Sequence, residues 1–99
     1  MAYQIEYSPD TEEHLRALTA RQRSMVFDAV DRQLANEPNK ETRNRKPMRP
    51  NPIAAWELCV RNLWVYYDIA EQPEKRVTTL AVGIKLRNRV RIGDREIEL

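Results

Sequence analysis

The chain has 99 residues, 32% of them charged and 41% hydrophobic, a balance typical of one small, ordered, soluble domain. It has no apolar run of about 18 residues, no basic segment followed by an apolar stretch near the N-terminus, and a single cysteine, Cys59. These features exclude a membrane-spanning helix, a visible secretory signal, an intramolecular disulfide and a multi-cysteine zinc site. We therefore expect a cytoplasmic protein that contacts no membrane and needs no metal or cofactor.

The net charge of +2 is distributed unevenly along the chain. Segment Glu41–Pro52 has a local net charge of +3 and segment Lys85–Arg95 one of +4, so the remaining residues sum to −5. Such segregation predicts a basic patch on an acidic body, which suits an anionic partner such as nucleic acid or an acidic protein. The alternative interpretation is a basic face that is only solvated.

The N-terminal third predicts a strand followed by two helices. Residues in Ala2–Tyr7 alternate between apolar and polar, as in a half-buried strand. Ser8 is an N-cap candidate before a proline and an acidic first turn, which predicts a short amphipathic helix over Pro9–Leu18. Thr19 and the glutamine three residues later fit a capping box, and apolar residues at three- and four-residue spacing predict a second helix over Ala20–Asn36. Two helices joined by so short a link form a hairpin that covers one face of a sheet.

Segment Ala55–Asp68 is the clearest structural signal in the chain. It contains two alternating apolar runs separated only by Arg61-Asn62, which predicts a β-hairpin with its turn at these two residues. Asn tolerates the positive φ that a tight turn requires. One face is predicted to be apolar, and the other to be partly polar with Glu57, Cys59, Arg61, Trp64, Tyr66 and Asp68.

The remaining segments complete an α+β fold. Pro38–Pro52 has four prolines and no apolar period, which predicts a loop. Arg76–Ile84 is a nearly continuous run of β-formers and predicts a buried strand. Asn88–Ile92 and Arg95–Leu99 predict a terminal hairpin around a Gly93-Asp94 turn. The expected fold is a single domain, residues 1–99, with an antiparallel sheet of four or more strands and the helical hairpin packed on one face.

This order of elements resembles the RelE/ParE superfamily of toxins from bacterial type II toxin–antitoxin systems, in particular its RelE-like branch. The resemblance spans nearly the whole chain at the level of pattern. The residues that carry it are Tyr3-Gln-Ile-Glu-Tyr-Ser-Pro, the helical pair with Leu15 and Leu18, Trp56 to Asp68, Leu80-Ala-Val-Gly-Ile-Lys, and the tail from Val90 to Leu99.

The resemblance implies a toxin that is neutralised by a cognate antitoxin protein. Members of the RelE type are metal-independent endonucleases that cut mRNA in the ribosomal A site, so the implied partners are the ribosome and mRNA. Members of the ParE type instead inhibit DNA gyrase and are not nucleases. A third alternative is an attenuated relative that retains only antitoxin binding.

For the nuclease hypothesis, the predicted catalytic residues are Arg61, Tyr66 and Lys85. Metal-free cleavage needs a group that accepts the 2′-OH proton, a cation that holds the phosphate and a donor for the leaving oxygen. Arg61 and Lys85 match basic positions of the family, whereas Cys59 and Trp64 stand where it commonly has basic residues. The predicted RNA-binding residues are Arg45, Lys46, Arg49, Trp64, Arg87, Arg89 and Arg91, the last replacing a family Tyr or His.

Two of these interpretations have non-functional alternatives. Trp64 and Tyr66 could stack on an unpaired base or could pack beneath the C-terminal hairpin or an antitoxin. The arginines and lysines could be solvated only. Cys59 is expected to be a small buried hydrophobe, and His14 a surface residue on the side of its helix opposite to the sheet.

Overall fold

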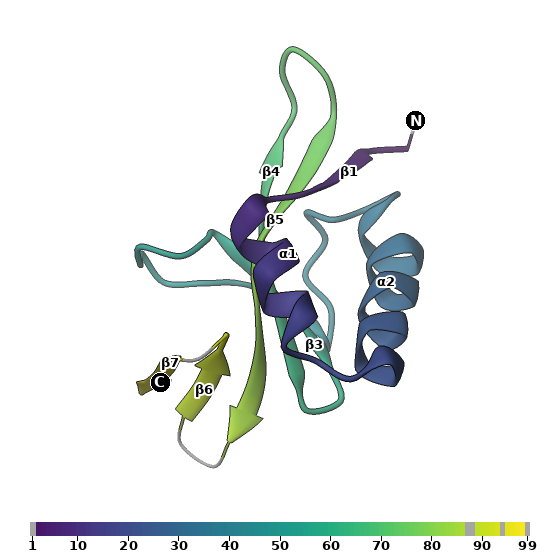
Figure 1. Ribbon diagram of the computed structural model, residues 1–99. Helices are drawn as coiled ribbons and strands as arrows, with labels where there is room; N and C mark the ends of the chain where they lie inside the picture. The colour runs from purple at the N-terminus through teal and green to yellow at the C-terminus, as the bar shows by residue number, and fades with distance from the viewer. Residues whose placement is uncertain (1, 87–88, 94, 99) are drawn as a thin grey trace.

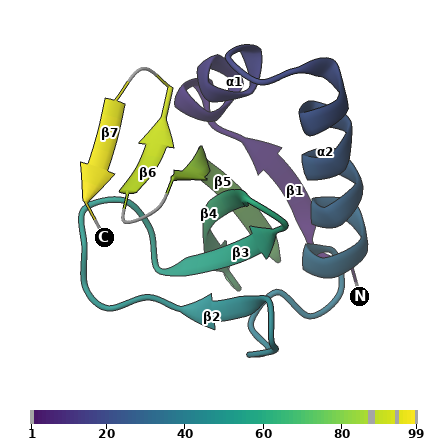
Figure 2. The same cartoon turned by 90° about the horizontal axis from the view of Figure 1, so that it is seen from below.

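The computed structural model describes residues 2–86, 89–93 and 95–98, in which two helices lie against one side of a strongly twisted sheet (Figures 1 and 2). No helix in these ranges is long and apolar enough to cross a membrane. The predicted α+β fold with a helical pair on one face of the sheet is confirmed.

Both helices begin where their capping residues predict. Helix α1 (Pro9–Arg16) starts after Ser8, whose hydroxyl oxygen accepts the backbone N–H of Thr11 at 3.1 Å. Helix α2 (Ala20–Leu34) starts at a complete capping box between Thr19 and Gln22. Each helix ends two residues before its predicted end, with Ala17 and Ala35 as the C-cap residues.

The sheet has seven strands, in the order β2-β3-β4-β5-β6-β7 with β1 beside β5. The strands are β1 (Gln4–Tyr7), β2 (Arg45–Pro47), β3 (Trp56–Val60), β4 (Leu63–Ala70), β5 (Arg76–Leu86), β6 (Arg89–Ile92) and β7 (Arg95–Glu98). All pairs are antiparallel except β1 with β5, which is parallel. Strand β2 lies inside the segment predicted to be only a loop. The predicted ends at Asn88, Asp94 and Leu99 lie outside the described residues.

The predicted central hairpin is present as β3 and β4, with pairs running from Trp56–Tyr67 to Val60–Leu63. Its turn lies at Arg61 and Asn62, as predicted. The left-handed conformation, however, belongs to Arg61 (φ 57°) and not to Asn62. Because a non-glycine residue adopts this conformation at a cost, the strong strand pairing on both sides must hold it there.

The two faces of the sheet differ in how they are covered. The face beneath the helices holds the main core, in which Val26, Val30 and Leu34 of α2 pack on Leu58 and Val65. The opposite face has a second, smaller apolar cluster formed by Ala54, Tyr66, Ala81, Val90 and Ile92. Part of the face predicted to be polar is therefore covered by β6 and by the loop at residues 48–55.

Polar side chains of α1 complete an exposed edge of β5. Strand β1 pairs with residues 76–79 of β5 and β6 pairs with residues 83–86, which leaves the edge between them without a strand. Thr11 donates its hydroxyl to the Thr79 carbonyl at 2.7 Å, and the Val82 N–H donates to His14 Nδ1 at 3.3 Å. The expectation that His14 is a surface residue turned away from the sheet is wrong, because its ring is half-buried and serves as this acceptor.

Candidate nucleic-acid interface

The side of the sheet away from the helices carries a group of charged and aromatic side chains. We call it the open face and define it by Lys46, Glu57, Cys59, Trp64, Tyr66 and Lys85. Lys46 lies directly across from Glu57, Glu57 across from Tyr66, and Cys59 across from Trp64. Residues that oppose each other in an antiparallel pair project to the same face, so three strands contribute to one surface.

A small hollow of about 170 Å³ lies on this face over β2, β3 and β4. We call it the β2–β4 hollow. It is lined by Arg43, Asn44, Lys46, Glu57, Cys59 and Trp64. It thus combines two cations, one carboxylate and one aromatic ring.

Glu57 is the acidic group of the hollow. Its side chain is half-buried, and no hydrogen bond or ion pair reaches its carboxylate from the part of the chain that the structure describes. Burial raises its pKa above the ordinary 4.5, and the nearby positive charge of Lys46 partly offsets this effect. A carboxylate that is removed from water without a partner is costly, and such groups concentrate at functional sites.

Trp64 lines one side of the hollow, and Lys85 lies over its ring on the open face. The Lys85 ammonium lies 5.7 Å from the centre of the Trp64 ring, within the range of a cation–π contact. The indole N–H is buried and has no hydrogen-bond partner among the described residues. Lys85 remains exposed, so it can contact a further ligand while it covers the ring.

Tyr66 is not accessible in the way the nuclease hypothesis requires. Its side chain is only 2% exposed, because Ala54 and Ile92 cover it in the second apolar cluster. Burial, with a smaller contribution from the negative charge of Glu57, raises its pKa to about 12. The phenol is therefore protonated at neutral pH and cannot accept the 2′-OH proton.

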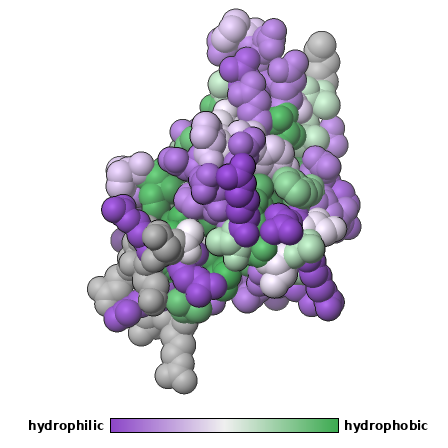
Figure 3. All heavy atoms as spheres, viewed as in Figure 1, coloured by the Kyte–Doolittle hydropathy of each residue, from purple (hydrophilic) through white to green (hydrophobic). Residues whose placement is uncertain are grey.

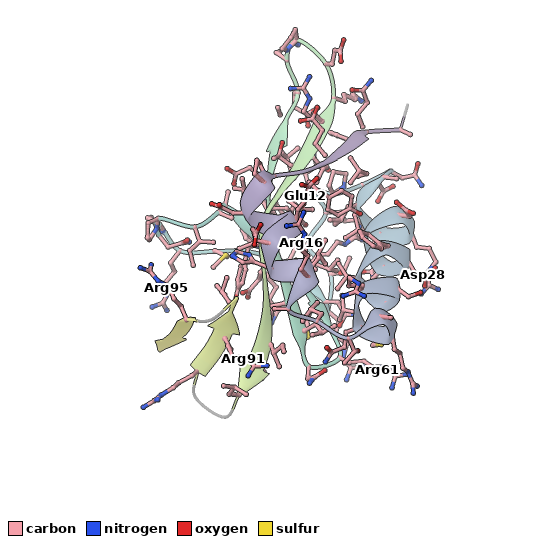
Figure 4. All side chains as sticks on the ribbon, in the orientation of Figure 1. Glu12, Arg16, Asp28, Arg61, Arg91 and Arg95 are labelled. Atoms are coloured by element: carbon pink, nitrogen blue, oxygen red, sulfur yellow. The ribbon has the colours of Figure 1, made fainter. Side chains whose placement is uncertain are left out.

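The three predicted catalytic residues are not brought together. The Lys85 N–H donates to the Asn62 carbonyl at 2.7 Å, which sets Lys85 four residues along β4 from Tyr66. That separation is about 13 Å at the rise of a β-strand. Arg61 lies at the tip of the hairpin beside α2, where it lines a different groove with Met25 (Figure 4).

Arg45 and Lys46 lie on opposite faces of β2. Arg45 opposes Leu58, a core residue on the helix side, and its guanidinium donates to the carbonyl of Gln33 and, at 2.9 Å, to that of Glu37. The guanidinium of Arg45, which is predicted to bind RNA, thus holds the end of α2 on the helix side and does not lie on the open face. Lys46, in contrast to Arg45, is exposed and lies on the open face.

The remaining predicted RNA-binding arginines do not extend the open face. Arg91 opposes Ile84 and Arg89 opposes Leu86, so both project to the helix side of the sheet, away from Lys85. Arg89, predicted to bind RNA, therefore does not continue the row that contains Lys85, because β6 runs antiparallel to β5 and pairs Arg89 with Leu86. Arg49 is exposed in the loop, and Arg87 lies outside the described residues.

A wider groove of about 820 Å³ lies beside α1 rather than on the open face. Its lining includes His14, Ile53, Leu80 and Arg95. Figure 3 shows green hydrophobic atoms beside the mainly purple surface of α1 on this side of the molecule. In residues 2–86, 89–93 and 95–98, no cluster of three or more His, Cys, Asp or Glu side chains could hold a metal ion.

Comparison with known proteins identifies the fold. No family model matches the sequence, and no curated protein matches it significantly. Among solved structures, the chain is similar to one from the crystal structure of the toxin–antitoxin complex RelBE2 of Mycobacterium tuberculosis, with a TM-score of 0.74 and 20% identity. The match covers 86% of this chain and 100% of that chain. The chain therefore shares the fold of that chain, which we call the RelE-like fold.

Glu57 and Arg43, which both line the hollow, are not among the site residues that the sequence predicts. Glu57 was placed on the polar face of its strand, but its opposition to Lys46 depends on β2, which has no sequence signature. Arg43 was counted only as part of the local charge. Alternation along β3 was the available signal for Glu57, and none pointed to Arg43.

Proposed function

We propose that this protein is the toxin of a type II toxin–antitoxin pair and that it inhibits translation by cutting mRNA on the ribosome. The RelE-like fold supports the class of protein. The observation that supports RNA as the ligand is the open face, on which the unpaired cations Lys46 and Lys85 flank an aromatic ring. Unpaired bases stack on such rings while cations hold the phosphates. Because ribosomes are cytoplasmic, the proposed activity implies a cytoplasmic protein.

The neutralising partner is an antitoxin protein. The structural neighbour comes from a toxin–antitoxin complex, and the charge and aromatic surface of the open face suit an acidic polypeptide as well as RNA. An antitoxin that covers the open face would exclude mRNA directly. A short adjacent reading frame for an acidic protein with a DNA-binding segment would support this pairing.

A second candidate function is a non-nucleolytic toxin, such as one directed at DNA gyrase. The observation that favours it is the placement of Arg61, Tyr66 and Lys85, which do not converge on one point. Under this alternative the cationic open face binds a protein or nucleic acid without cutting it. An attenuated relative that binds only antitoxin would leave the cell unaffected.

Induced expression without an antitoxin separates these functions. Primer extension on a translated message should show cleavage at codons within the reading frame, together with growth arrest. Arrest with intact mRNA would reject the endonuclease proposal and leave the non-nucleolytic toxin. Neither arrest nor cleavage would leave the attenuated relative.

A further inference from the structure

We infer that Glu57 is the general base of the proposed cleavage reaction, with the β2–β4 hollow as the place where the reacting nucleotide binds. This inference rests on the proposed endonuclease function and goes beyond it by naming the residue that starts the chemistry. It replaces Tyr66 in that role.

The first support is the position of Glu57 between a cation and an aromatic ring. Lys46 lies directly opposite on β2, and Trp64 contributes the neighbouring row of the same face. Side chains directly opposite in an antiparallel pair have Cβ atoms about 5 Å apart. A nucleotide bound in the hollow would therefore have its 2′-OH within reach of Glu57 and its phosphate within reach of Lys46.

The second support is the unengaged state of the carboxylate. Five other glutamates each have a hydrogen-bond or ion-pair partner for the carboxylate: Glu6, Glu13, Glu37, Glu71 and Glu74. Glu57 is half-buried in the hollow, yet none of the described residues forms a hydrogen bond or an ion pair with its carboxylate. Its two oxygens are thus available to a substrate hydroxyl.

The third support is basicity. Burial raises the pKa of Glu57 above its ordinary value, so it binds a proton more readily than an exposed glutamate does. A base with a raised pKa transfers protons more effectively near neutral pH. Tyr66, with a pKa of about 12, stays protonated and cannot substitute for it.

The reaction then balances with residues of the open face. Glu57 takes the proton from the 2′-OH, and the 2′ oxygen attacks the adjacent phosphorus. The bond between phosphorus and the 5′ oxygen breaks, and that oxygen takes a proton from the Lys46 ammonium, which lies directly opposite Glu57. The products are a 2′,3′-cyclic phosphate and a 5′-hydroxyl end, while Arg43, which lines the same hollow, holds the charge on the phosphate.

The test is single-turnover cleavage of a defined message on purified ribosomes, measured from pH 5 to pH 9. The wild-type rate should rise with pH along an acid limb whose midpoint lies above 4.5, the ordinary pKa of the group. Glu57→Gln, which keeps the shape and removes the base, should lower the rate about 10²–10⁴-fold and abolish that limb. Glu57→Asp should restore part of the rate together with the limb.

The matched control is Glu12→Gln, since Glu12 is exposed on α1 in the helix layer (Figure 4). It should leave the rate and its pH dependence unchanged. A Glu57→Gln variant that cuts at the wild-type rate, or that cuts slowly but keeps the acid limb, would overturn the inference while the endonuclease function stands. A wild-type protein that leaves the message intact would overturn both, and that outcome is distinct because no variant is needed to see it.

Discussion

Arg45 shows how strongly a single side chain can tie a loop to a helix in this fold. Its guanidinium donates to the carbonyl of Gln33 in the last turn of α2, where carbonyls lack partners within the helix, and to that of Glu37 just beyond the helix. A cation near a helix C-terminus also interacts favourably with the helix dipole. Arg45 therefore joins strand β2 to the helix layer, and Lys46, one residue later, is left free for the open face.

Replacing Arg45 by Met should lower the free energy of unfolding by about 1.5–3 kcal/mol, the range for hydrogen bonds to charged groups. The methionine keeps much of the apolar stem, so the loss reports mainly on the donors. Lys46→Met is the matched control and should change stability by less than about 0.5 kcal/mol, as exposed substitutions do. Urea unfolding of both variants measures the difference. Equal losses would contradict the assignment of Arg45 to structure.

His14 makes the stability of the fold depend on pH. Its Nδ1 accepts the Val82 N–H, which only the neutral ring can do, and burial lowers its pKa, an effect that Asp10 and Glu13 partly oppose. Because the folded protein then binds the proton less readily than the unfolded chain, the contribution of His14 is fully present above the unfolded pKa of about 6.5. It is lost as the pH falls through the lowered folded pKa.

His14→Asn tests this dependence, because an asparagine oxygen can replace Nδ1 as the acceptor but does not titrate. Wild-type stability should fall relative to that of the variant between pH 7 and pH 5. The comparison is made by urea unfolding at both pH values, and the background from the carboxylates cancels between the two proteins. A constant difference across this range would show that His14 does not titrate on unfolding.

At the scale of elements, the contact between β5 and β6 depends on Gly83. A Cβ atom at this position would lie 2.4 Å from Val90 Cγ1 and 2.9 Å from Ile92 Cγ1. Side chains of β6 therefore cross over the backbone of β5 to reach the second apolar cluster. The same crossing covers Tyr66, so Gly83 helps to decide which part of the sheet remains open.

Gly83→Ala should destabilise the protein by about 1–3 kcal/mol, as overpacking does in a filled core. Val90→Ala in the same chain removes the nearer of the two clashing groups. The double variant should consequently lose less stability than the sum of the two single losses. Thermal unfolding of the four proteins in this cycle gives the coupling, and simple additivity would contradict the described packing.

Elements specified by local pattern were predictable from the sequence, and those specified by long-range pairing were not. Ser8, Thr19 and the Arg61-Asn62 turn act within a few residues, so their capping and turn signals are visible in the chain. Strand β2 forms only because β3 offers it an edge, and nothing in its own three residues indicates a strand. The parallel pairing of β1 with β5 likewise depends on residues more than 70 positions apart.

The sequence predicts which face of the sheet carries the candidate site, but not which residues form it. Alternation placed Glu57, Trp64 and Tyr66 on one side correctly. It could not show that the loop at residues 48–55 buries Tyr66. It also failed beyond Leu86, because the reversal into β6 pairs Arg89 with Leu86 and so exchanges the faces of the following residues. Register across a turn is a property of the fold and not of the local pattern.

At the scale of the whole molecule, the helix layer and the open face divide two tasks. The helices and the main core stabilise the sheet, and the opposite face presents cations that have no acidic partner among the described residues. A net charge of only +2 gives weak long-range attraction. The central claim is therefore that the proposed binding of RNA depends on where the cations are placed.

The most direct test compares two variants that remove the same charge from opposite layers. Lys46→Ala/Lys85→Ala alters the open face, and Arg16→Ala/Arg21→Ala alters exposed positions of the helix layer. Binding to ribosomes programmed with mRNA is measured as a function of salt concentration. The open-face variant should bind more weakly, with a slope of log K against log[salt] reduced by about 1.4–1.8, whereas the helix-layer variant should match the wild type. Equal slopes for the two variants would contradict an RNA-binding open face.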